Sequence, residues 1–245
     1  MSDTIETRAQ QALDRWKEFW GDALQAVYLY GSAARGEYSS KTSDINLLLL
    51  VEKADYKRWP DAATLAKRLG KKGFALPLML NRHYIESSAD VFPMEFLDIQ
   101  LFHKTLTGED IFTDLQIDRN DLRLQAEREI RGKWVQLRQS TLERGNETIE
   151  MRNLLGMTVP TWVAVFQALL FLQEQEVPSS KSEVLKRGCA IADVDPAPFL
   201  EIQAMRREKK ALNRMRAWEL IRQLLNELDK LIAYVDNDDS FRLSS

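Results

Sequence analysis

The segment from residue 26 to residue 51 constrains the fold of this chain more than any other part. A short apolar run, Ala26–Tyr30, predicts a strand that ends at Gly31 and Ser32. A polar connection follows, and Asp44 then opens a second apolar run that continues to Val51. An apolar run without alternation is typical of a strand that is buried on both faces. The two runs therefore predict a covered sheet with a small turn and an acidic residue at its strand ends.

Helical patterns lie on both sides of these strands. Apolar residues recur at helical spacing over residues 3–20, and a second helical pattern covers residues 56–69. Two further apolar runs predict strands at 76–80, where Pro77 restricts the strand to a sheet edge or a strand start, and at 92–101. Strands interleaved with helices predict an α/β-type N-terminal domain with a small mixed sheet, over residues 1–117.

The second half of the chain has helical patterns almost throughout. We expect helices over 121–144, 148–174, 181–187 and 198–235, the third of them ended by Gly188. Only 10 glycines and 7 prolines occur in 245 residues, which also favours helices over loop-rich structure. The predicted class is therefore α+β, with an all-α helical bundle over residues 118–245.

One uncharged stretch of the second half fits either a buried helix or a membrane span. Residues 154–172 carry no charge and reach the lower length limit for a membrane span. Gly156, Pro160 and Gln167 make this stretch a poor span, and charged residues of both signs flank it. We expect a buried bundle helix and no membrane contact, with a span as the alternative.

The net charge and the cysteine content limit the kinds of partner and the cellular compartment that we expect for this protein. The 34 basic and 37 acidic residues give a net charge of −3, which does not favour nucleic acid as a partner. The single cysteine, Cys189, cannot form a disulfide within the chain, and the first residues lack the pattern of a secretory signal. A cytoplasmic location is expected. With one cysteine and two histidines, a metal ion would be held mostly by oxygen ligands, as Mg²⁺ or Mn²⁺ is.

The residues that can carry chemistry concentrate around the first two strands. Small side chains at Gly31 and Ser32 let a ligand approach the backbone, and N–H groups at the start of a following helix can bind phosphate oxygens. Asp44 and Asn46 lie two positions apart in the predicted strand, so their side chains point the same way. A phosphate cradle beside a strand carboxylate predicts metal-assisted phosphoryl or nucleotidyl transfer.

The sequence resembles a known family at this point. The run Tyr28-Leu-Tyr-Gly-Ser-Ala-Ala-Arg-Gly, followed by Ser43-Asp-Ile-Asn-Leu-Leu-Leu, is similar to the signature of the polymerase-beta-type nucleotidyltransferases, above all the bacterial minimal and aminoglycoside enzymes. In that signature, Gly-Ser is followed by a polar connection and by Asp-x-Asp in an apolar strand. Many members of the family also carry a helical domain after the catalytic one.

The resemblance implies a ligand set. It implies a nucleoside triphosphate, with ATP expected, held by Gly31 and Ser32, and Mg²⁺ or Mn²⁺ held by Asp44 with the oxygen of Asn46. A third carboxylate comes from a later strand in this family, and Glu95 and Asp98 are the candidates for both catalysis and metal binding. They are three residues apart, so on a strand they face opposite ways and one of them serves. Arg35 either contacts phosphate or is a solvated arginine.

Asn46 departs from the family signature, which has a second aspartate there. An amide oxygen can bind a metal ion but brings no charge. Two unit charges about 4 Å apart interact by ~4 kcal/mol at an effective dielectric of 20, and a divalent ion doubles that value before desolvation is deducted. Replacing a carboxylate by an amide therefore weakens a metal site strongly.

Two functions of different classes follow. The leading one is Mg²⁺-dependent transfer of a nucleoside monophosphate from a triphosphate to a hydroxyl acceptor, a small molecule or a protein. The alternative is a catalytically degenerate nucleotide-binding or regulatory module, for example an antitoxin-like protein, because of Asn46. The sequence leaves the acceptor and the oligomeric state open.

Overall fold

The computed structural model describes residues 4–40, 43–145, 147–208 and 212–237. Contacts divide the chain into two compact units. The first comprises residues 1–90 and 96–116, and the second comprises residues 91–95 and 117–245. The division falls within one helix, α4 (Pro93–Leu101).

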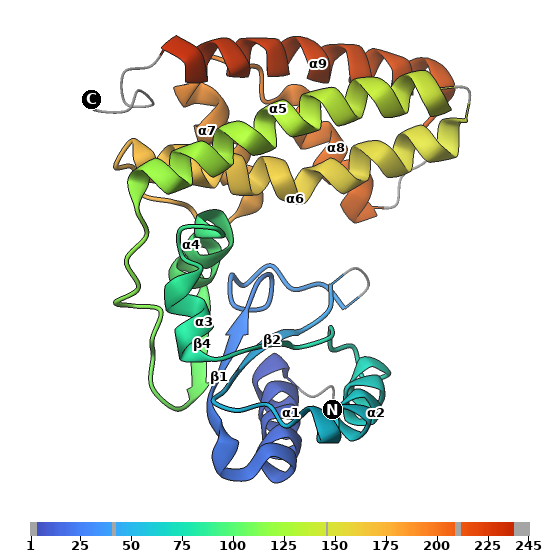
Figure 1. Cartoon of the computed structure of the whole chain (residues 1–245). Coiled ribbons are helices and arrows are strands. Elements are labelled where there is room, and N and C mark those ends of the chain that lie inside the picture. The colour runs from blue at the N-terminus through green and yellow to red at the C-terminus, as the bar shows by residue number, and fades with distance from the viewer. Residues whose placement is uncertain (1–3, 41–42, 146, 209–211, 238–245) are drawn as a thin grey trace. The chain divides into compact units, whose positions relative to one another are not determined.

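The first unit is built on a four-stranded mixed sheet (Figure 1). Its strands, in the order β3-β2-β1-β4, are β3 (Leu78–Leu80), β2 (Asn46–Val51), β1 (Leu24–Tyr30) and β4 (His103–Thr107). β1 pairs antiparallel with both of its neighbours, whereas β2 and β3 are parallel. The expected small mixed sheet is thus confirmed, and β3 is an edge strand that begins directly after Pro77, which agrees with both positions that Pro77 allows.

Alternate residues of β1 and β2 face two helices of the first unit. Thr4 is the N-cap of α1 (Ile5–Trp20), and its hydroxyl accepts a hydrogen bond from the backbone N–H of Thr7 at 3.2 Å. α1 and α2 (Trp59–Gly70) bury Trp16 and Leu69 in one core with Leu29 and Leu49 of the sheet. The 3-10 turns η1 (Gly21–Ala23) and η2 (Tyr56–Arg58) precede β1 and α2.

The remaining residues of β1 and β2 point to the opposite face of the sheet. There the ring of Tyr28 packs edge-on against Phe112, with centroids 5.0 Å apart. Phe112 in turn contacts Phe96 of α4, with centroids 6.5 Å apart. Both faces of the middle strands are therefore covered, which explains their unbroken apolar sequence.

The strand predicted at 92–101 is wrong, because this segment is the helix α4. An apolar run of this length fits a buried strand and a buried helix equally well by periodicity. Pro93 takes the first helical position, where its missing N–H costs nothing. The fourth strand of the sheet is instead β4, a polar edge strand that the apolar pattern does not reveal.

The short helix α3 (Arg82–Ser87) lies between β3 and α4. Its N-cap is Asn81, whose side chain accepts a hydrogen bond from the backbone N–H of Tyr84.

The second unit contains five long helices within its described residues (Figure 1). They are α5 (Arg119–Arg144), α6 (Thr148–Leu172), α7 (Lys181–Ile191), α8 (Ala197–Glu208) and α9 (Arg214–Asn237). α6 packs against the other four. The predicted helical character of the second half is confirmed.

Two predicted helix ends in this unit are wrong. Gly188 does not end α7, which continues to Ile191, because Gly188 is the point where α7 meets α6. A Cβ at Gly188 would lie 2.4 Å from the Cβ of Phe166. The helix predicted over 198–235 is two helices, and the second begins where the side chain of Asn213 accepts from the N–H of Arg216 at 2.8 Å. Residues 209–211 lie outside the described part.

α6 contains the uncharged stretch 154–172. It is long and apolar enough to cross a membrane, but 72% of its most apolar window is buried inside the protein. Trp162, Phe166 and Leu169 are each at most 1% exposed. The burial is that of the core helix of a bundle.

Candidate functional site

A row of three side chains crosses the sheet at the end of β1. Tyr30 pairs with Asn46 of β2 on one side and with His103 of β4 on the other. Residues directly opposite each other in antiparallel strands share a face, so these three side chains lie on the face away from α1 and α2. The chain then leaves the sheet through Gly31.

Gly31 is required by two features of its position. Its φ of 72° lies in the left-handed region, which favours glycine. A Cβ at Gly31 would also lie 2.7 Å from the side-chain nitrogen of Asn46. The sequence motif thus brings Gly31 and Asn46 into direct contact.

The residues after Gly31 form successive turns rather than the helix start expected from the sequence. The backbone N–H of Arg35 donates to the carbonyl of Gly31 at 3.0 Å, and that of Glu37 donates to Ser32 at 2.9 Å. Gly36 again has a left-handed φ, of 79°. Turns of this kind can present backbone N–H groups to an anion.

Arg35 is a buried residue, so its interpretation as a solvated arginine is wrong. Its side chain is 1% exposed and forms an ion pair with Asp98 of α4. The guanidinium carbon lies 3.7 Å above the centre of the Phe102 ring. Arg35 therefore connects the turn to α4 and to the residue that follows it.

Asp98 is the predicted carboxylate that reaches the motif. Asp98 pairs with Arg35 and also affects Tyr30. The pKa of the Tyr30 phenol is raised, first by burial of the phenol and then by the nearby negative charge of Asp98. Sequence reasoning did not select Tyr30, although its position directly before Gly31 was a usable signal.

The two other predicted carboxylates have different surroundings. Glu95 is exposed, belongs to the second unit, and accepts a hydrogen bond from the side chain of Gln125 at 2.8 Å. Because α4 is a helix, Glu95 and Asp98 lie on neighbouring positions of one helix face and not on opposite faces of a strand. Asp44 is exposed and lies two positions before Asn46, the first residue of β2. The prediction that Asp44 and Asn46 belong to one strand is therefore wrong.

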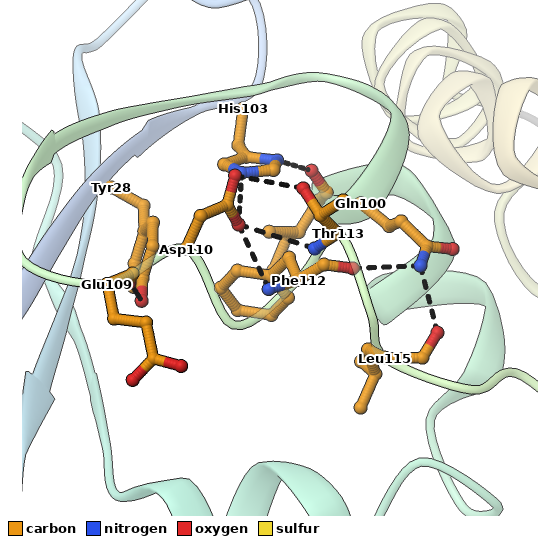
Figure 2. A network of polar contacts seen from close by, with 9 residues as sticks. Tyr28, Gln100, His103, Glu109, Asp110, Phe112, Thr113 and Leu115 are labelled. Carbon is orange, nitrogen blue, oxygen red and sulfur yellow. Dashed lines mark hydrogen bonds and ion pairs between the residues drawn. The ribbon is translucent and has the colours of Figure 1, made fainter.

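His103, at the other end of the row, is held by a polar network (Figure 2). Its Nδ1 lies 2.7 Å from the carbonyl of Ile99 and its Nε2 lies 3.0 Å from the carboxylate of Asp110. Asp110 also accepts from the N–H of Phe112 at 3.1 Å and from the hydroxyl of Thr113 at 3.0 Å. These hydrogen bonds fix β4 beside Tyr30.

The comparisons with known proteins agree with this geometry. Residues 9–108 match the sequence profile of the nucleotidyltransferase domain family. The family model thus assigns a nucleotidyltransferase domain to this part of the chain. The match contains β1, the Gly31–Gly36 turn, β2, α4 and β4, whereas Asp110 and Thr113, which belong to the network around His103, lie just beyond its end.

A solved structure has a similar fold. The chain is similar to spectinomycin adenyltransferase from Enterococcus faecialis, whose crystal structure contains ATP and spectinomycin, with a TM-score of 0.55 and 13% sequence identity. The similarity covers 93% of this chain and 100% of that one. At this identity the likeness establishes the fold. No curated protein matches this sequence.

The nucleotidyltransferase family implies a divalent metal ion, but the described residues do not fit one. Among them, no three Asp, Glu, His or Cys side chains lie together as metal ligands. None of the four strands contains Asp or Glu. Asp98 is already paired with the guanidinium of Arg35, whose like charge opposes a divalent ion on the same carboxylate.

Proposed function

We propose that this nucleotidyltransferase domain binds a nucleoside triphosphate at the Gly31–Ser32 turn and acts as a nucleotide-binding module without fast metal-dependent transfer. One observation carries the second half of the proposal. The position next to Gly31 that the family signature gives to an aspartate is Asn46, and no strand of the sheet supplies a carboxylate to replace it.

Nucleotide binding itself is supported by the turn. The Gly31–Gly36 turn contains two glycines with left-handed φ, a backbone conformation that occurs in anion-binding turns. The hydroxyl of Ser32 is a further donor for a phosphate oxygen. A protein that keeps the binding turn and lacks the metal ligands suits a regulatory role, for example an antitoxin-like one.

Nucleotidyl transfer to a small hydroxylated acceptor is the second candidate. The family match and the similarity to an adenyltransferase solved with ATP and spectinomycin favour it. In that case Asp44, Asn46 and Asp98 or Glu95 would hold Mg²⁺ or Mn²⁺. The contacts of Asp98 and Glu95 described above oppose this arrangement.

Calorimetry with a non-hydrolysable ATP analogue separates the two candidates. We expect the wild type to bind the analogue with similar affinity in EDTA and in Mn²⁺, and to release no pyrophosphate when given ATP and Mn²⁺. Dependence of binding on Mn²⁺, together with pyrophosphate release, would establish the transferase instead. No binding of any nucleoside triphosphate in either buffer would refute both candidates.

Asn46→Asp is the diagnostic variant. It adds a charged oxygen ligand beside the turn, so Mn²⁺ should bind this variant more tightly than the wild type. In a binding module this change does not by itself create fast turnover, because the acceptor must also be positioned. Equal Mn²⁺ affinity in the wild type, Asn46→Asp and Asp44→Ala would exclude residues 44–46 as a metal site.

A further inference from the structure

Arg35 and Asp98 come from segments that are 63 positions apart, yet they form an ion pair inside the first unit. The side chain of Arg35 is 1% exposed and that of Asp98 is 32% exposed. An arginine buried to this degree needs an anionic partner, because a buried charge left without one is strongly unfavourable. Asp98 supplies that charge.

The pair is connected to the ligand-binding turn through the backbone. Arg35 lies in the turn, and its N–H donates to the carbonyl of Gly31 at 3.0 Å. Its guanidinium is also fixed from the other side by the ring of Phe102, 3.7 Å away. Arg35 therefore connects the side chains of Asp98 and Phe102 to the backbone that positions Gly31.

We infer that Arg35 and Asp98 are positioning residues whose ion pair fixes the Gly31–Gly36 turn against α4, and that Asp98 serves as the partner of Arg35 rather than as a metal ligand. The effect on Tyr30 agrees, since the charge of Asp98 faces the strand that leads into the turn. The inference rests on the proposed function only for its nucleotide readout.

The test compares Asp98→Asn, Arg35→Met and the double variant with the wild type. Each single change removes the ion pair between the two side chains, so we expect affinity for a non-hydrolysable ATP analogue to fall at least about tenfold, both in EDTA and in Mn²⁺. Glu109→Gln is the matched control, because Glu109 also pairs with an arginine of this unit, Arg82, but is 72% exposed. Its affinity should stay within about twofold of wild type.

The double variant decides whether the two residues act as one unit. It removes both charges, so its affinity and its urea midpoint should be no lower than those of the weaker single variant. Additive losses would overturn the inference. So would an Asp98→Asn variant that keeps wild-type affinity in EDTA but loses an enhancement by Mn²⁺, because that pattern identifies a metal ligand.

The unfolding measurements keep the inference separable from the proposed function. If no protein in the series binds the ATP analogue, the proposed function fails. The urea midpoints of the four proteins still report the coupling between Arg35 and Asp98. A non-additive cycle then supports the pair as the anchor of the turn, and an additive cycle rejects it.

Discussion

The side-chain nitrogen of Asn46 lies 2.7 Å from the point that a Cβ of Gly31 would occupy. Gly31 directly follows β1 and Asn46 begins the neighbouring strand β2, and the absence of a side chain at Gly31 makes room for the side chain of Asn46. The glycine and the asparagine of the sequence motif therefore lie next to each other at one end of the sheet.

We predict that Gly31→Ala destabilises the protein and weakens nucleotide binding. The new methyl group meets Asn46, and a φ of 72° costs a non-glycine residue about 1–2 kcal/mol. Urea unfolding and calorimetry measure the two effects. Adding Asn46→Ala should restore the part of the stability lost to the clash but not the part due to φ.

Gly70→Ala is the control for that variant. No atom lies within 4 Å of the added Cβ, and the backbone there is not left-handed. We expect no loss of nucleotide affinity. An equal loss in both glycine variants would show that the contact with Asn46 has no special role.

Gly188→Ala should destabilise the second unit. The added Cβ would lie 2.4 Å from the Cβ of Phe166, so α7 must move away from α6, at a cost of about 1–3 kcal/mol or more. Thermal or urea unfolding measures the change. In contrast, Gly132→Ala in α5 adds a methyl group in open space and should stabilise the helix by about 0.5–1 kcal/mol.

The Asp110 network predicts a dependence of stability on acid. Burial by itself raises the pKa of Asp110, but hydrogen bonds from His103, Thr113 and the N–H of Phe112 together hold that pKa below the ordinary value of 3.8. A lowered pKa in the folded state gives stability that is present above the ordinary value and is lost as the pH falls through the folded one.

The measurement is the free energy of unfolding between about pH 5 and pH 2. Wild type should lose stability more steeply over this range than Asp110→Asn, which cannot titrate at that position. Asp114→Asn, which removes a carboxylate from an exposed position of the same loop, is the control variant. Identical slopes in the wild type and Asp110→Asn would contradict the prediction.

Cys189 should be unreactive in the folded protein. The residue is fully buried, and burial, followed by the charges of Asp195 and Glu227, raises the pKa of its thiol far above the ordinary value. Because the thiolate is the reactive form, a thiol reagent should modify the protein only under unfolding conditions. Rapid modification in native buffer would show that α7 opens readily.

The sequence by itself determined the parts of this protein that depend on local pattern. Unbroken apolar runs identified β1 and β2, Pro77 restricted β3 to a sheet edge or a strand start, and the motif from Gly31 to Asn46 identified the domain family that residues 9–108 match. These signals are short-range, because strand burial, turn formation and helical periodicity each depend on residues that are close together in the sequence.

The tertiary structure decided what depends on residues far apart in the sequence. The apolar run at 93–101 fits a strand or a helix until its neighbours are known, and only the fold makes it α4. That outcome brings Asp98, and not Glu95, to Arg35. Arg35 is buried instead of solvated for the same reason: its partner is 63 residues away, and no local pattern encodes which charges meet in the folded chain.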